Sequence, residues 1–342
     1  MVIIKEVIHS MSNMVLARIP THPKNINKNM IRNGYFLDPV NQLNQSEYSR
    51  NYYQPITTID SWDLSSNNGT ASVQLTDFEG IKFQVDNVDE ILNNPYSNFL
   101  HNVLSKEFQH YPNDKIYTIS IVGNIKTCVL GYNNIWFTAL STQNGFGTRT
   151  FSIEEKNISS PLSIVFQLNN QGETSNIQAV KLEPGTEQTL VGYKNNNYEL
   201  QIIDIPNKEE ELRRCQNELY CLFAKDYNAG NNSIIGSFYC WQDGKGQLVV
   251  PIPVPFSTNE PKIYFRNLRF IYCGDINGSF AKMQIEIPEL SNNIGFISVS
   301  KNNIIVSIKN ESFRTGMTGW VDFMNLDGYF IASCNVVDTT NL

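Results

Sequence analysis

Short apolar segments of alternating character, separated by turn-forming residues, constrain this chain more than any other feature. Segments 71–75 and 81–85 flank a glycine-bearing loop and predict a β-hairpin. Asparagine, which tolerates left-handed backbone and caps its own turns, recurs in pairs and triplets and favours loops between strands. Further strands of the first half are predicted at 117–122, 136–140 and 163–168.

The second half continues the same pattern. Segments 296–300 and 304–308 face each other across a short polar loop, which predicts a second hairpin. Prolines at 251, 253 and 255 remove the backbone donors along one side, so this stretch fits only a sheet edge or an extended connector. Other strands are expected at 237–241 and 247–254, and the tail at 320–337 is expected to supply one more strand pair.

Two helices are expected among these strands. In the first, Asn94 is placed to cap the helix and Pro95 suits its first position. Its apolar face comprises Tyr96, Phe99, Leu100, Val103, Leu104 and Phe108. The second is expected at about 207–225, with Asn207 as its cap and glutamates in its first turn. Its apolar positions, Leu212, Cys215, Leu219 and Leu222, step by three, four and three, which fits a short coiled-coil contact or packing within the domain.

Composition excludes several function classes. The 342 residues are 41% hydrophobic and 17% charged, with a net charge of −7 and no basic cluster beyond Arg213-Arg214. Nucleic-acid binding is not expected, because such proteins usually present a concentrated basic face. No apolar run approaches the length of a membrane span, so membrane insertion is not expected either. Charges at Lys5, Glu6 and Arg18 interrupt the N-terminal apolar residues and argue against a signal peptide.

The six cysteines lie apart, without the close pairs of a zinc site or a disulfide framework. Buried free thiols are expected, as in a protein that is assembled in a reducing cytoplasm.

Four segments, in order, resemble the C-terminal region of tail-fibre and receptor-binding proteins from phages and prophages of gut and clostridial bacteria. They are IRNGYFLDPVNQLNQSEY (31–48), TTIDSW (57–62), VKLEPGTEQTL (180–190) and EEELRRCQNELY (209–220). The chain departs from that pattern at Ser61, where an arginine is usual, and at Leu43-Asn44, where Arg-Gly is frequent.

The resemblance implies an all-β fold of two β-sandwich or jelly-roll domains in tandem, with one short helix in or before each. Residues 1–30 would form an N-terminal arm or linker that attaches to other tail proteins, against the alternative of a disordered leader. Residues 31–192 would form a carbohydrate-binding-like jelly roll, and 193–342 a C-terminal β-sandwich domain. The expected protein is a homotrimeric virion appendage, made in the host cytoplasm, whose partner is a glycan of the host cell surface.

Two aromatic-polar loops are candidate sugar sites, because saccharide sites pair an aromatic platform with amides and charged groups that reach the hydroxyls. The first loop contains Tyr48, Arg50, Tyr52 and Tyr53. The second contains Tyr132, Asn133, Asn134 and Trp136. Trp62 is an alternative platform, but its size also suits a plug at one end of a sandwich, and we favour that role.

No cofactor is expected, apart from a structural calcium ion with Asp38 and Asp60 as its candidate ligands. Neither residue lies in the alternating acidic pattern of a dedicated calcium loop, so the presence of a metal stays open.

Catalysis is not expected. The four histidines lie at 9, 22, 101 and 110, so the C-terminal domain holds none for a Ser-His-Asp or Cys-His site. Paired carboxylates for glycoside cleavage remain compatible with the sequence, because such partners usually come from separate strands. Three alternatives therefore stay open: a receptor-binding tail protein, a purely structural virion component and, less favoured, a glycan-degrading enzyme.

Overall fold

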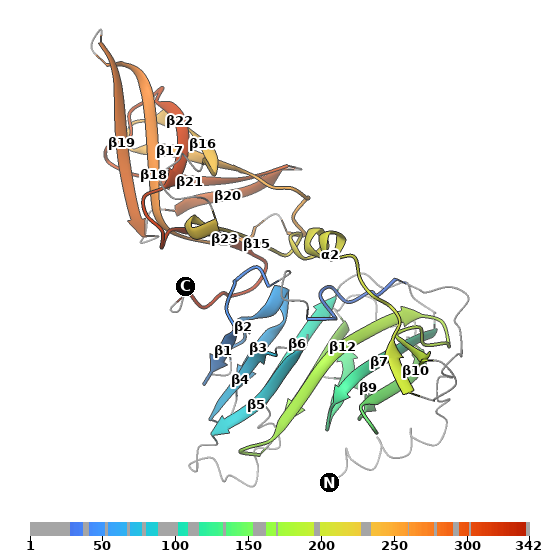
Figure 1. Ribbon diagram of the computed structural model, residues 1–342. Coiled ribbons are helices and arrows are strands. Elements are labelled where there is room, and N and C mark those ends of the chain that lie inside the picture. Colours follow the sequence, from blue (N-terminus) through green and yellow to red (C-terminus); the bar gives the residue numbers. More distant parts are fainter. Residues whose placement is uncertain are drawn as a thin grey trace. The chain divides into compact units, whose positions relative to one another are not determined.

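The chain folds into two compact units, Met1–Glu211 (unit 1) and Leu212–Leu342 (unit 2), and both consist mainly of antiparallel strands (Figure 1). The expected all-β fold class is therefore confirmed. The computed structural model describes residues 28–36, 41–51, 54–66, 69–76, 80–87, 102–108, 116–132, 135–152, 162–168, 170–194, 199–226, 234–258, 260–276, 279–289, 294–300 and 302–339. The expected N-terminal arm thus lies almost wholly outside the described residues.

Unit 1 is built on two six-stranded sheets. Sheet A has the order β1-β4-β5-β12-β7-β10, and sheet B has the order β2-β3-β6-β11-β8-β9. The strands of sheet A are β1 (Glu47–Arg50), β4 (Thr70–Leu75), β5 (Ile81–Asn87), β7 (Ile116–Asn124), β10 (Phe146–Ser152) and β12 (Thr174–Pro184). Those of sheet B are β2 (Ile56–Thr57), β3 (Asp63–Ser66), β6 (Asn102–Phe108), β8 (Cys128–Tyr132), β9 (Ile135–Leu140) and β11 (Leu162–Leu168). A separate two-stranded sheet follows, with β13 (Val191–Lys194) and β14 (Glu199–Ile202).

The chain passes repeatedly from one sheet to the other, as it does in jelly rolls, and the two inner faces form the core. Trp62 follows the short 3-10 helix η3 (Ile59–Ser61) and is fully buried. Its ring lies 4.9 Å from the ring of Phe36 and 5.9 Å from that of Phe166 on β11. The expectation that Trp62 is a core plug is thus confirmed, and this ring is not available to a sugar.

The segment 28–36 lies along β12 beyond Ile177, the last residue of β12 that is in register with β5. The Asn29 side chain donates to the Val180 carbonyl (2.8 Å) and accepts from the Leu182 amide (3.1 Å), so it pairs with the strand as a peptide group would. A β-carbon on Gly34 would meet the Val180 oxygen at 2.2 Å, so the close approach requires glycine.

The first expected helix is wrong where the structure describes it. Its second half, Asn102–Phe108, is strand β6, which pairs with β3 on one side and β11 on the other. Val103 and Leu104 have helical spacing in the sequence, but a central position in sheet B satisfies the backbone of both. The first half of that expected helix lies outside the described residues.

The second expected helix exists but is short. Helix α2 (Lys208–Cys215) begins after Asn207, whose side chain accepts from the Glu210 amide at 3.0 Å, so the expected cap is confirmed. Leu219 and Leu222 belong instead to strand β15 (Leu219–Phe223), so the expected heptad spacing is not carried by one helix. The suggested coiled-coil contact is therefore wrong.

In unit 2, the strands join one nine-stranded sheet. The path is β15-β23-β18-β22-β16-β17-β21-β20, and β19 pairs with β18. The strands besides β15 are β16 (Gly236–Gln242), β17 (Lys245–Pro251), β18 (Lys262–Ile276), β19 (Ser279–Glu289), β20 (Ile294–Ser300), β21 (Asn303–Lys309), β22 (Thr318–Phe323) and β23 (Tyr329–Ser333). A 3-10 helix, η6 (Ala224–Asp226), follows β15.

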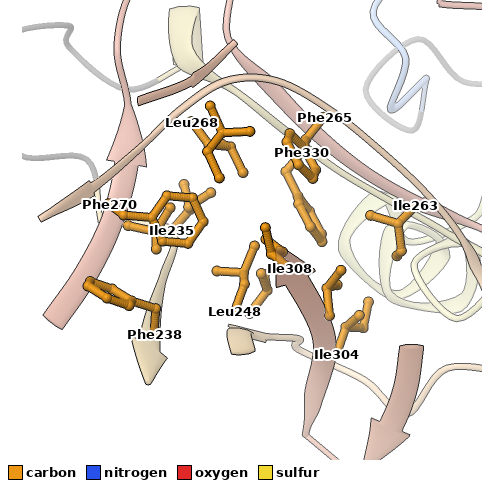
Figure 2. Packing of buried hydrophobic residues seen from close by; sticks show 14 of the residues in the cluster. Ile235, Phe238, Leu248, Ile263, Phe265, Leu268, Phe270, Ile304, Ile308 and Phe330 are labelled. Atoms are coloured by element: carbon orange, nitrogen blue, oxygen red, sulfur yellow. The ribbon is translucent and has the colours of Figure 1, made fainter. Parts of the chain in front are cut away.

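Side chains from one face of this sheet converge on a single apolar core (Figure 2). Phe238, Phe270 and Phe313 contact one another, with ring centroids 5.4–6.1 Å apart. Alternate residues of the sheet face the other way: Tyr239 on β16 is exposed there, whereas Ile271 on β18 and Asp322 on β22 are buried.

The expected hairpins are confirmed at β4–β5 and β20–β21, and the strands expected at 237–241 and 247–254 pair as β16 and β17. The expected tail pair is different, because β22 and β23 flank β18 and are not paired with each other. Strand β17 ends at Pro251, before the expected end at 254, and the prolines at 253 and 255 lie outside the strand because they cannot donate to a ladder.

Cys128, Cys215 and Cys240 are buried, Cys221 and Cys334 are partly buried, and none of these five forms a disulfide. Of the described residues, none belongs to a helix long and apolar enough to cross a bilayer.

Candidate binding surface

The first expected sugar loop lies at the β1 edge of sheet A. Tyr48 is 5% exposed, and its hydroxyl donates to the Asn41 side chain at 2.6 Å, so its ring is part of the interior. Arg50 is directed to the chain itself, because its Nε donates to the Gln54 carbonyl at 2.9 Å. Tyr52 and Tyr53 lie outside the described residues.

The second expected loop lies at the tip of the β8–β9 hairpin, at the edge of sheet B. Tyr132 is in register with Ile135, and Trp136 with Gly131. Asn133 and Asn134 lie outside the described residues. Strand β9 is beside β10, whereas β1 is beside β3 at the other edge of the sandwich, so the two loops are not brought together (Figure 1).

Asp60, one of the two expected calcium ligands, is fully buried with a left-handed backbone (φ 44°). Its carboxylate accepts from the Asn33 side chain at 2.7 Å and from the Gln42 amide at 3.2 Å. These bonds hold the backbone around Asn33 and Gln42 against η3. Asp38 lies outside the described residues, and within the described ranges no three His, Cys, Asp or Glu side chains come together in a way that could hold a metal ion.

A buried charged cluster covers part of the outer face of sheet A. Lys181 on β12 donates to Asp204 (2.6 Å) and to the Thr189 hydroxyl (2.7 Å), and Glu183 accepts from the Thr189 amide at 2.7 Å. Burial, together with a hydrogen bond to Asp204, raises the pKa of Tyr35 far above its usual range. Lys181 also lies 3.6 Å from the Glu183 carboxylate, so its polar partners are all within unit 1, and the cluster holds the segment that follows β12 against the sheet.

Unit 2 presents a different outer face. Along β16, Phe238 and Cys240 are buried, while Tyr239 is 47% and Trp241 is 38% exposed. Successive strand residues point to opposite faces, so both exposed rings lie on the outward side of the sheet. Trp241 also lies at a register shift between β16 and β17, and such a bulge can redirect a side chain.

A third ring extends this row. Trp320 on β22 is in register with Ser237, two pairs along from the Tyr239–Thr318 pair. Diagonal neighbours on one sheet face are within reach of aromatic side chains, so Trp320, Tyr239 and Trp241 form an oblique line, which we call the aromatic strip.

Polar groups border the aromatic strip. Tyr239 is in register with Thr318 on β22 and with Gln247 on β17, and Gln247 is in register with Ser307 on β21. The indole Nε1 of Trp320 is buried and has no acceptor among the described residues. The surface thus combines ring faces with hydroxyl and amide groups and one unused donor.

The sequence interpretation missed this surface, although a signal was present. The sequence predicts only a strand at 237–241. Aromatic residues occur at both even and odd positions of this segment. On a strand with one buried face the outward positions are normally polar, so aromatic residues at those positions mark an unusual surface.

Comparisons with known proteins give little further guidance. No family model matches the chain, and no curated protein matches it. Among solved structures, the alignment with the tandem CBM22-1–CBM22-2 domain of Paenibacillus barcinonensis Xyn10C includes 90% of this chain and 98% of that domain. The identity is 7% and the TM-score is 0.26. An anti-sigma factor domain-containing protein covers 70% and 84%, with 12% identity and a TM-score of 0.17. TM-scores this low carry no argument about function.

Proposed function

We propose that the protein binds a glycan, without turning it over, through the aromatic strip of unit 2. The exposure of Tyr239 and Trp241 on a sheet face bordered by hydroxyl and amide groups carries this proposal. A pyranose ring has an apolar face of C–H groups that stacks on an aromatic ring, while its hydroxyls bond to neighbouring polar side chains. A row of exposed rings of this kind suits an extended saccharide chain.

We further propose that the protein acts in a phage or prophage tail and recognises a bacterial surface glycan. The four motifs between residues 31 and 220 support this part of the proposal through their resemblance to tail receptor-binding proteins. Single sites of this size bind weakly, and a homotrimer carrying several copies gains avidity. The N-terminal arm would then join the protein to the virion.

A glycan array probed with the full chain tests the binding. We expect the array signal to be lost in the double variant Tyr239→Ala/Trp241→Ala, because stacking of a ring contributes about 1–3 kcal/mol per aromatic contact in comparable nucleic-acid systems. Leu326→Ala, which removes another exposed apolar side chain of unit 2, is the matched control and should bind normally.

Two results would overturn these proposals separately. Undiminished binding by the double variant would exclude the strip as the site, and release of reducing ends from a bound polysaccharide would exclude binding without turnover. If the rings are instead an assembly contact, the double variant would change the oligomeric state in light scattering and leave the array signal unchanged.

A further inference from the structure

Two lysines lie at one end of the aromatic strip. Lys245 on β17 is directly in register with Lys309 on β21, and both are exposed. Buried Gly246, Leu248 and Ile308 occupy the alternate positions, so both lysines are on the outward face with Tyr239. Directly opposed strand residues have their α-carbons about 5 Å apart, and like charges in such positions are destabilising.

No acidic side chain of the described residues forms an ion pair with either lysine. An acid lies two residues from each lysine in the sequence, Asp243 from Lys245 and Glu311 from Lys309. Asp243 is engaged elsewhere: it accepts from the Thr315 amide at 2.8 Å and from the Thr315 hydroxyl at 3.0 Å. Those two bonds, with a smaller effect of Arg314, lower the pKa of Asp243. The repulsion between the lysines is therefore left uncompensated on this face.

At the opposite end of the aromatic strip, a charged side chain on the same face is paired within the protein. Arg269 on β18 is in register with Asp322 on β22, two residues from Trp320. Its guanidinium makes a two-point contact with the carboxylate, at 2.8 and 2.7 Å. The arginine is thus neutralised within the protein, whereas the lysine pair is not.

The bulge between β16 and β17 places Trp241 next to the lysine pair. Gln242 is in register with Lys245, and Cys240 with Gly246, so Trp241 lies between these two pairings. A sugar ring stacked on Trp241 would have its edge beside the two ammonium groups.

We infer, on the basis of the proposed glycan binding, that the ligand is an acidic glycan containing a uronic acid, whose carboxylate lies between Lys245 and Lys309. In a uronic acid the carboxyl carbon is bonded directly to the ring, so an equatorial carboxylate extends along the ring plane. A ring that lies flat on Trp241 therefore directs this group across the sheet face and not away from it. A phosphate or sulfate ester has additional rotatable bonds and is less well matched to two fixed neighbouring cations.

The test uses the full chain and calorimetric titration with three soluble probes. They are an oligogalacturonate, the same oligosaccharide with its carboxylates reduced to alcohols, and a sulfated oligosaccharide of equal length that contains no carboxylate. We expect the oligogalacturonate to bind about tenfold more tightly than its reduced form, a difference of about 1.4 kcal/mol. Raising the salt concentration should weaken the binding of the acidic probe and leave that of the reduced probe unchanged, because exposed charge pairs are screened.

Two double variants separate a local from a general charge effect. Lys245→Gln/Lys309→Gln should abolish the preference for the acidic probe, while the protein remains folded by circular dichroism. Lys82→Gln/Lys262→Gln removes the same charge from two other strands and should keep the preference.

Each remaining outcome decides a separate point. Equal binding of the acidic and reduced probes would overturn the uronic acid inference and leave the proposed function standing. Tighter binding of the sulfated probe would overturn the choice of a carboxylate. Binding of none of the three would contradict the inference, and failure of every glycan on the array would also remove the proposed function.

Discussion

The outward face of sheet A and the outward face of the unit 2 sheet follow opposite rules. Across sheet A, one row of register partners is entirely polar: Glu47, Gln74, Lys82, Asn176 and Asn124. Across unit 2, a row of the same length contains Trp320, Ser237, Val249, Ile305 and Ser298. Both sheets bury their other face in an apolar core.

The difference teaches where a ligand is to be sought. An antiparallel sheet with one buried face ordinarily presents polar residues to water, and the exposed part of sheet A does so. The aromatic and aliphatic side chains of Trp320, Val249 and Ile305 depart from this rule, because they lie on the outward face and outside the core cluster. A contiguous patch of this kind marks an interaction site.

The largest expected effect tests the core of unit 1. Trp62→Ala should lower the free energy of unfolding of unit 1 by about 3–5 kcal/mol, because small shifts of Phe36 and Phe166 cannot fill the cavity left by the indole ring. Hydrogen exchange should show faster exchange in sheets A and B. Exchange in β16 and β17 and glycan binding should stay unchanged, and a loss of binding would contradict the assignment of the site to unit 2.

A somewhat smaller effect is expected for the covered part of sheet A. Lys181→Met removes the cation that is bonded to Asp204 and leaves buried acceptors without it. Breaking one side of such a buried pair costs about 3 kcal/mol, and here less because Asp204 retains some exposure. Chemical denaturation measures the change, and Lys82→Met, on the exposed part of the same sheet, is the control and should be within about 0.5 kcal/mol of the parent.

The smallest effect concerns one thiol and tests the orientation of β16. Burial raises the pKa of Cys240 to about 11, so at pH 8 the folded protein holds almost none of it as the reactive thiolate. The unfolded thiol ionises near its ordinary pKa of about 8.5, so this group contributes stability below that pH and the contribution is lost as the pH rises toward 11. Alkylation followed by mass spectrometry should label Cys221 and Cys334 before Cys240. Rapid labelling of Cys240 would mean that Tyr239 and Trp241 face the interior.

Much of the fold was predictable, because it depends on local signals. The β4–β5 and β20–β21 hairpins follow from alternating residues around short polar loops, and the cap of α2 follows from Asn207. Strand β6 was not predictable in this way. Its residues have helical spacing, and only pairing with β3 and β11, which are distant in sequence, makes them a strand.

The candidate site was harder to predict than the fold. Aromatic residues near turns predict a site that includes Tyr48, whose ring is buried, and they do not indicate Tyr239 and Trp241. Which side of a strand faces the core depends on the partners of that strand. The sequence of β16 is apolar on both sides, so the outward side could be identified only after its register with β17 and β22 was known.

Footprinting by hydroxyl radicals, with and without a saturating glycan selected on the array, tests the central claim most directly. We expect protection of Tyr239, Trp241 and Trp320, with no change at Tyr48 or in the β8–β9 hairpin. Protection confined to residues 48–53 or 131–136, with the three rings of unit 2 unchanged, would contradict the claim.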